Sequence, residues 1–205
     1  MSKNVTIIDY HCGNLKSVEQ ALRHCGAEVQ VTTKLDQVLT ASKLILPGVG
    51  AFPVGMAHLH EAGLVDAIKS KVAEGTPLLG ICLGMQLLLE HSEEHGGADG
   101  LGLVEGNVVK MQSTQTSIKL PHIGWNKLEL KKSDSLLTSD DYFYFVHSYK
   151  AVPKNHLDIL ATSRYEDIDF CSAIAKGNVW GVQFHPENSS KPGLEILRNF
   201  ITLNS

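Results

Sequence analysis

PLLGICLGMQ, residues 77–86, runs an apolar strand straight into a cysteine that has one glycine two residues before it and another two residues after it. A side chain that must project from a tight strand-to-helix turn needs neighbours of minimal bulk, which Gly80 and Gly84 supply. Residues 85–90 favour a helix, so Cys82 is expected at a helix N-terminus, where unpaired N–H groups and the helix dipole favour a thiolate. The stretch predicts a nucleophile elbow, with a buried structural cysteine as the alternative.

The composition is that of an ordinary globular domain. The chain has 205 residues and a net charge of −4, and its acidic and basic residues are interspersed. A single domain over residues 1–205 is therefore expected, with neither nucleic acid nor a membrane among its partners. The N-terminal stretch MSKNVTIIDY is neither a signal-peptide core nor a spanning helix, which predicts a cytoplasmic protein.

The four cysteines include no CxxC pair. This spacing argues against a zinc ribbon, a thioredoxin-type site and a disulfide framework. Cys12, Cys25 and Cys171 are expected to be small apolar packing residues, which leaves Cys82 as the candidate nucleophile.

Strands and helices alternate through the first half of the chain. Short apolar runs predict strands at residues 5–9, 28–31, 43–46 and 77–81, and helical spacing predicts helices at 14–25, with Asn14 as N-cap, and at 64–74. This alternation indicates an α/β fold with a mainly parallel, doubly covered sheet. The second half predicts antiparallel additions, with strands at 107–111, 125–130, 142–146, 157–162, 172–175 and 179–184 before a closing helix at 193–203.

A second motif, WGVQFHPE at residues 180–187, supplies a candidate base. Residues two apart on an extended chain point to the same side, so Glu187 can lie beside His185 and orient its ring. His185 could then accept the proton of Cys82 and later donate it to a leaving amine, as in a Cys-His-Glu triad. An HxE tripeptide alone is most often a pair of solvated surface residues, but the GICLG motif in the same chain favours the triad.

The loop LPGVGAF, residues 46–52, places two glycines around Val49. Its backbone can approach a ligand closely, so the N–H of Val49 or of Gly50 could bind an oxyanion together with the N–H of Leu83. The alternative is an ordinary Gly-Pro turn. Neither a phosphate-binding loop nor a dinucleotide fingerprint is present, so no cofactor is expected.

Residues outside these motifs carry weaker signals. His122 and His147 lack the spacing of a metal-binding pair, so they are expected to be core or loop histidines, and no metal site is assigned. Alternation along residues 142–145 puts Tyr142 and Tyr144 on one face of a strand, with Phe143 and Phe145 on the other. The tyrosine face could line an interface.

Together, the motifs resemble the class I glutamine amidotransferases, in which GxCxG and a later HPE supply a Cys-His-Glu triad. Further stretches resemble the glutaminase subunits of imidazole glycerol phosphate synthases: DYHCGNLKSV at 9–18, LPGVGAF at 46–52, GICLGMQLL at 80–88, PHIGWN at 121–126 and YFVHSY at 144–149. The resemblance implies that Cys82, His185 and Glu187 hydrolyse L-glutamine to glutamate and ammonia. Ammonia would then pass to a (β/α)₈-barrel cyclase subunit in a heterodimer of histidine biosynthesis.

The resemblance also implies further site residues. The oxyanion strand falls on residues 47–50, with Leu83 as the second donor. The residues similar to the family's glutamine-binding set are Gly50, Gln86, Glu94, His147, Ser148 and Tyr149. Those similar to its contacts with the synthase subunit, around the ammonia passage, are Asn14, Trp125, Asn126 and Tyr144.

One departure from the family pattern leaves the pathway open. Many members have a basic residue directly after HPE, whereas this chain has Asn188, and Lys191 could replace that charge. Related glutaminase subunits act with other synthases in surface-polysaccharide pathways, which is one alternative. An independent cysteine hydrolase of the γ-glutamyl type is a second, and a catalytically silent regulatory subunit is a third, disfavoured because all three triad residues are present.

Overall fold

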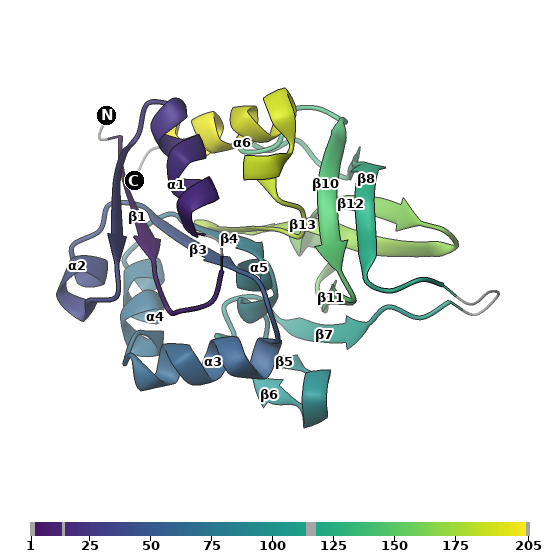
Figure 1. Cartoon of the computed structure of the whole chain (residues 1–205), viewed down its shortest axis with the longest axis horizontal. Helices are drawn as coiled ribbons and strands as arrows, with labels where there is room; N and C mark the ends of the chain where they lie inside the picture. Colours follow the sequence, from purple (N-terminus) through teal and green to yellow (C-terminus); the bar gives the residue numbers. More distant parts are fainter. Residues whose placement is uncertain (1–2, 14, 114–117, 204–205) are drawn as a thin grey trace.

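The computed structural model describes residues 3–13, 15–113 and 118–203 and shows one large mixed sheet between two layers of helices (Figure 1). Five strands form the parallel half of this sheet, in the order β2, β1, β3, β4 and β14. Their bounds are β1 Asn4–Ile8, β2 Glu28–Thr32, β3 Leu44–Gly48, β4 Leu78–Cys82 and β14 Val179–Val182. Strands β3, β4 and β14 are buried along their whole length, because helices cover both faces.

The other half of the sheet is mostly antiparallel. From β14 the order continues through β13, β11, β7, β5 and β6, and β12 pairs with β13 and with β9. Their bounds are β5 His91–Ser92, β6 Ala98–Asp99, β7 Gly106–Lys110, β9 Glu129–Leu130, β11 Tyr149–Pro153, β12 Ile159–Tyr165 and β13 Ile168–Lys176. The predicted combination of a parallel core with antiparallel additions is therefore confirmed.

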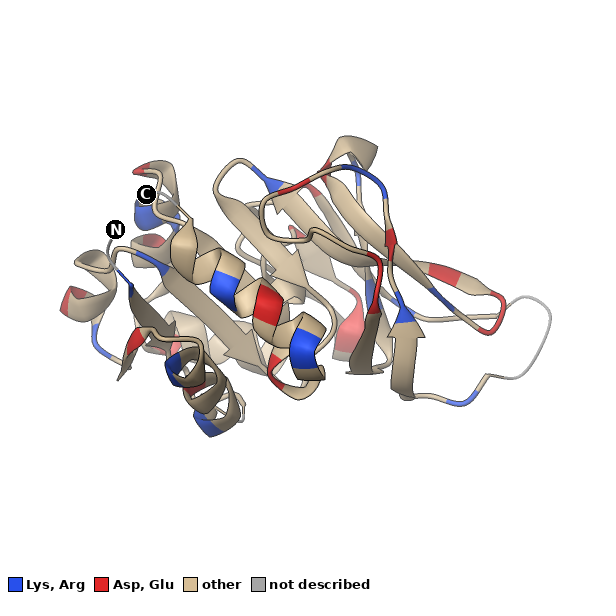
Figure 2. Cartoon of the chain, turned by 90° about the horizontal axis from the view of Figure 1, so that it is seen from above, with Lys and Arg blue, Asp and Glu red and all other residues tan. Residues whose placement is uncertain are grey.

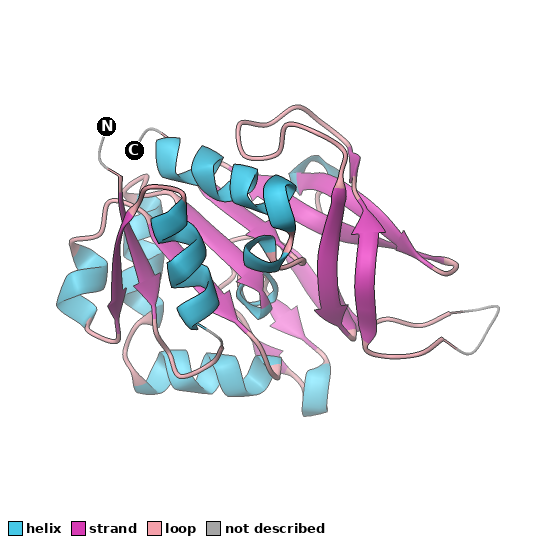
Figure 3. Cartoon of the chain, turned by 45° about the horizontal axis from the view of Figure 1, so that its top comes forward, coloured by secondary structure: helices cyan, strands magenta, loops and turns pink. Residues whose placement is uncertain are grey.

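Helices cover the two faces of the sheet unevenly. Helices α1 and α6 lie on one face, while α3 and α4 lie on the other (Figures 1 and 3). The bounds are α1 Leu15–His24, α2 Leu35–Leu39, α3 Phe52–Glu61, α4 Val65–Ala73, α5 Leu83–Leu87 and α6 Ser190–Thr202, with short 3₁₀ turns η1 Glu94–Gly96, η2 His156–Asp158 and η3 Pro186–Asn188. Helix α6 buries Leu197, Phe200 and Ile201 in the core, at the helical spacing that the sequence predicts.

A separate two-stranded ribbon stands at one side of the main sheet (Figure 1). It is formed by β8 His122–Lys127 and β10 Tyr142–His147, which pair in antiparallel register. Phe143 and Phe145 are buried, Tyr142 is exposed and Tyr144 is half-buried. The predicted alternation along β10 is therefore confirmed.

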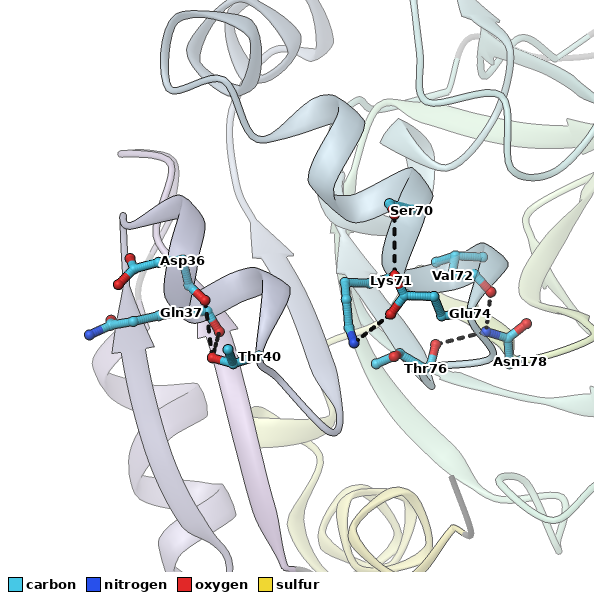
Figure 4. Close-up of polar contacts among 9 residues, drawn as sticks. All are labelled: Asp36, Gln37, Thr40, Ser70, Lys71, Val72, Glu74, Thr76 and Asn178. Carbon is cyan, nitrogen blue, oxygen red and sulfur yellow. Dashed lines mark hydrogen bonds and ion pairs between the residues drawn. The ribbon is translucent and has the colours of Figure 1, made fainter.

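The starts of β4 and β14 are tied together at the end of the sheet remote from Cys82. The Asn178 side chain donates hydrogen bonds to the backbone carbonyls of Val72, at 2.9 Å, and of Thr76, at 2.7 Å (Figure 4). Val72 lies in the last turn of α4 and Thr76 in the turn before β4, so the Asn178 amide ties the residue before β14 to this turn. The two strands then run in register from Leu78 beside Val179, so their far ends emerge side by side.

Figure 2 shows Lys and Arg interspersed with Asp and Glu along the described part of the chain. None of the helices in that part is long and apolar enough to cross a membrane.

Several elements differ from the sequence expectations. The helix expected at 85–90 is α5, which begins earlier, at Leu83, and is only five residues long. Strand β11 and helices α2 and α3 were not predicted. Helix α3 begins with Phe-Pro and contains Gly55, and these residues obscure its helical periodicity. Asn14, the expected N-cap of α1, lies outside the described residues.

Candidate active site

Cys82 occupies a strained turn between β4 and α5. It is the last residue of β4 and has φ 54° and ψ −107°, a conformation that non-glycine residues rarely adopt. A Cβ atom at residue 80 would lie 2.7 Å from the backbone of Gly84, and one at residue 84 would lie 1.7 Å from the carbonyl oxygen of Leu46. Both glycines are thus required by close packing, as the elbow prediction expects.

His185 and Glu187 follow the end of β14, beside the end of β4. Nδ1 of His185 lies 2.8 Å from Oε1 of Glu187, and both side chains are almost fully buried. Nε2 of His185 is buried and makes no hydrogen bond with the described residues. The carboxylate therefore fixes the ring through Nδ1 and leaves Nε2 available for chemistry.

The ring of His185 is held in its charged form. Burial alone would lower its pKa, but interactions with Cys82 and then with Glu187 outweigh burial and raise the pKa of His185 to about 10. A protonated imidazole is the kind of partner that stabilises a neighbouring thiolate. The pair Cys82 and His185 can therefore supply both a nucleophile and a proton for a leaving group.

Gln183 is a residue near the nucleophile that the motifs did not single out. Its Nε2 lies 3.7 Å from Cys82 Sγ, while its Oε1 accepts a hydrogen bond of 2.9 Å from Gln86 Nε2. The strand register points to this contact, because Ile81 pairs with Val182, and Cys82 and Gln183 are the residues that follow them. From the sequence, the only signal is that Gln183 precedes His185 by two residues.

A cavity of about 410 Å³ opens at Cys82. The residues expected to bind glutamine all line it: Gly50, Gln86, Glu94, His147, Ser148 and Tyr149. Two of these side chains are held by hydrogen bonds to the backbone. Glu94 Oε2 accepts from the N–H of Phe52 at 2.7 Å, and Gln86 Nε2 donates to the carbonyl of Tyr149 at 3.1 Å. The cavity thus has fixed polar groups on its wall.

The three expected oxyanion donors also line this cavity: Val49, Gly50 and Leu83. The loop after β3 lies beside Cys82, since Gly48 pairs with Cys82 in the register of β3 and β4. Val49 is 43% exposed, and Gly50 has φ 114°, a backbone angle that favours glycine. The loop is therefore placed to present N–H groups at the nucleophile.

His122 and His147 form a buried pair at one end of the ribbon, and His147 also lines the cavity. His122 Nδ1 lies 3.2 Å from His147 Nε2, and His122 Nε2 lies 2.8 Å from Asn126 Oδ1. Burial lowers the pKa of both rings, that of His147 to about 3. Among the described residues, no three or more His, Cys, Asp or Glu side chains form a group that could hold a metal ion.

Three of the four expected partner-facing residues, Trp125, Asn126 and Tyr144, lie on the ribbon. Trp125 is 49% exposed and packs edge-on against Tyr144, with ring centroids 6.0 Å apart. Asn126 is tied inward, because it bonds to His122 and to the backbone carbonyl of Arg164. Asn14, the fourth of these residues, lies outside the described part of the chain.

With this site at the ends of β4 and β14, the chain belongs to the class-I glutamine amidotransferase family, whose model matches residues 6–203. Curated relatives of high similarity carry the name imidazole glycerol phosphate synthase subunit HisH. The relative from Moorella thermoacetica is 46% identical over 199 residues, which cover 96% of this chain and 93% of the relative. A relative from Methanococcus maripaludis is 45% identical over 202 residues, which cover 96% of this chain and 98% of the relative.

Solved structures share the fold at lower sequence identity. A crystal structure of a glutamine amidotransferase superposes with a TM-score of 0.73 at 22% identity, covering 92% of this chain and 94% of the other. The structure of PurLQS from Thermotoga maritima superposes with a TM-score of 0.72 at 18% identity, covering 98% of both chains. These likenesses confirm the predicted fold class.

Proposed function

We propose that this chain is the glutaminase subunit of an imidazole glycerol phosphate synthase, with Cys82, His185 and Glu187 as its catalytic triad. The observation that carries the proposal is the convergence of a strained cysteine at the end of β4 with a buried His–Glu pair at the end of β14. Near-full-length identity of 45–46% to the relatives named as this subunit supports the choice of reaction.

The first half of the reaction transfers the glutamyl group to the enzyme. The Cys82 thiolate attacks the carboxamide carbon of glutamine, and the carbonyl electron pair moves onto oxygen. The carbon–nitrogen bond then breaks as the His185 imidazolium gives its proton to the departing nitrogen, so ammonia leaves. The products of this half-reaction are a glutamyl thioester and a neutral imidazole.

The second half restores the enzyme. A water molecule attacks the thioester carbon while His185 takes one of its protons, and the carbon–sulfur bond breaks to return the thiolate. Glutamate is released. Glu187 keeps the ring of His185 in the orientation that both half-reactions need, through the bond to Nδ1.

The loop after β3 supplies transition-state stabilisation in this proposal. The N–H of Val49 or Gly50, together with that of Leu83, would hold the negative oxygen of each tetrahedral intermediate. Glutamine would occupy the cavity at Cys82, with its carboxamide at the sulfur and its polar end among Gln86, Glu94 and Tyr149.

Ammonia released at Cys82 would pass to a cyclase partner that docks on the ribbon side. A second cavity, of about 200 Å³, lies beside the first and shares Val49 and Val146 with it, and His185, Glu187 and Asn188 line it. We propose a (β/α)₈ barrel for the partner, a heterodimer for the assembly, one domain for this chain and a cytoplasmic location. The cyclase would use ammonia to form imidazole glycerol phosphate and aminoimidazole carboxamide ribotide.

Reconstitution tests this proposal. The purified chain is mixed with the cyclase subunit of a histidine pathway and its phosphoribulosyl substrate, and glutamate and imidazole glycerol phosphate are both measured. Formation of both products in equal amounts supports the proposal. Activation by a synthase from a surface-polysaccharide pathway alone would overturn the choice of partner, and full activity without any partner would favour an independent hydrolase.

A further inference from the structure

Gln183 belongs to a buried line of amides that ends on the sulfur of Cys82. The side chain of Gln183 is fully buried, and its Nε2 is 3.7 Å from Cys82 Sγ. Its Oε1 is 2.9 Å from Gln86 Nε2, which is also 3.1 Å from the backbone carbonyl oxygen of Tyr149. The line therefore joins a backbone carbonyl in the cavity wall to the nucleophile through two side chains.

The carbonyl at one end fixes the orientation of both amides. A backbone carbonyl only accepts hydrogen bonds, so the group of Gln86 that faces Tyr149 must be its NH₂. This NH₂ donates its other hydrogen to Gln183, so the atom of Gln183 that faces Gln86 must be the acceptor Oε1. The NH₂ of Gln183 is then the end that faces Sγ, where it is a donor.

Gln183 and His185 lie two residues apart in the segment that follows β14. Gln183 Nε2 contacts the sulfur directly, and His185 interacts with Cys82 as well. The imidazole can exchange a proton with the thiol. The amide cannot, but a hydrogen bond to the charged form of a group favours that form.

We propose that Gln183 is a second residue, beside His185, that keeps Cys82 in the thiolate form by donating an N–H to Sγ. The assignment rests on the proposed function, in which Cys82 is the nucleophile. No bond to Gln183 forms or breaks during the reaction. Because negative charge leaves the sulfur during attack, the hydrogen bond favours ionisation of the thiol and departure of the thiolate from the thioester, and not the attack itself.

The effect of the Gln183–sulfur contact can be measured separately from the effects of the titratable groups near Cys82. Replacing the uncharged Gln183 leaves every titratable side chain around the sulfur in place. These are Tyr10 after β1, Glu94 in η1, His147 at the end of β10, Tyr149 in β11, and His185 with Glu187 after β14.

The test measures the rate at which iodoacetamide alkylates Cys82 as a function of pH, with peptide mapping to separate Cys82 from the other cysteines. No glutamine is needed. Gln183→Met, which keeps length and loses the donor, should move the midpoint of the rate upward by about one pH unit, a tenfold loss of thiolate below the midpoint. Gln86→Met, which frees the Gln183 amide to rotate, should move it in the same direction by less.

Two further variants, the Gln86→Met/Gln183→Met double variant and Ser172→Ala, separate the effect of a lost hydrogen bond from that of altered packing. Among the described residues, Gln86 makes its hydrogen bonds to Tyr149 and Gln183 and none to the sulfur, so Gln86→Met added to Gln183→Met should move the midpoint no further. Ser172→Ala is the matched control, because Ser172 is equally buried, its backbone carbonyl accepts from the Gln183 N–H, and its hydroxyl bonds to no described residue. This control should leave the midpoint unchanged.

The outcomes distinguish this inference from the proposed function. An unchanged midpoint in a folded Gln183→Met protein, or additive shifts in the double variant, would overturn the role of Gln183 alone. If Gln183→Met fails to fold, an unchanged midpoint in Gln86→Met overturns it. Preferential alkylation of a cysteine other than Cys82 in the wild-type chain would instead overturn the nucleophile on which the proposed function depends.

Discussion

Gly84 lies directly against Leu46, so closely that a Cβ atom at residue 84 would stand 1.7 Å from the Leu46 carbonyl oxygen. This contact packs the start of α5 against β3 and holds Cys82 in the turn between β4 and α5. Strained residues of this kind persist only where the surrounding structure holds them in place. Gly84 therefore helps to hold the nucleophile in this conformation.

Gly84→Ala should destabilise the protein by about 3 kcal/mol or more, because the obstacle is backbone that cannot move without displacing β3. Urea unfolding followed by circular dichroism measures the change. Gly55→Ala in α3 is the matched control, since a Cβ there would meet only the flexible ends of Leu83 and Leu87 at 3.3 Å. Gly55→Ala should stay within about 1 kcal/mol of wild type. Equal stability of the two variants would contradict the packing explanation of the elbow.

Cys82→Ala should abolish glutamate release by several orders of magnitude while the chain still folds and binds its partner, because no other group can form the thioester. A coupled glutamate dehydrogenase assay measures the loss. Cys25→Ser serves as control, because Cys25 is half-buried and its sulfur donates a hydrogen bond to the backbone carbonyl of Leu194. Substantial turnover in Cys82→Ala would exclude the covalent mechanism.

Glu187→Gln should retain partial glutaminase activity, whereas His185→Ala should lose nearly all of it. The carboxylate only orients the ring, while the ring itself carries the proton. Steady-state kinetics of both variants with the same partner preparation measure the difference. Similar, near-wild-type rates in the two variants are incompatible with the triad.

The raised pKa of His185 predicts how the stability of the fold depends on pH. Because the folded-state pKa is raised to about 10, above the ordinary value of about 6.5, the charged ring stabilises the fold fully below pH 6.5 and loses this contribution as the pH rises through about 10. Cys82→Ala removes one of the two partners that hold the proton. NMR titration of the His185 ring should therefore give a lower pKa in Cys82→Ala than in wild type, and an unchanged value would contradict the pairing.

Sequence patterns predicted the active-site end of the molecule better than the rest. GICLG and HPE mark residues whose chemistry requires particular neighbours, and the structure brings Cys82, His185 and Glu187 to adjoining strand ends. Strand β11 went unpredicted because its sequence, YKAVP, ends in proline and lacks a clear alternation. Gln183 was missed because a buried glutamine acquires a role only from the partners that tertiary packing gives it. The assignment of one domain and the roles of the site residues remain predictions.

The loop after β3 should make the isolated chain slow and dependent on its partner. Val49 is exposed between Gly48 and Gly50, so its peptide can adopt more than one orientation at low cost. A misaligned oxyanion donor costs roughly 3 kcal/mol, on the order of a hundredfold in rate. Glutaminase rates of the chain alone, with the cyclase, and with the cyclase plus its nucleotide ligand should therefore rise in that order. Equal rates in all three would contradict the gating.

Covalent labelling tests the central claim most directly, since it asks which atom attacks a glutamine-like carbonyl. The chain is incubated with a diazo-ketone analogue of glutamine, alone and with its partner, and the labelled peptide is identified by mass spectrometry. The label should appear on Cys82 only, and excess glutamine should protect that residue. A label on Cys12, whose sulfur lies 3.2 Å from His58 Nδ1 and forms the other cysteine–histidine contact in the described part of the chain, would contradict the account.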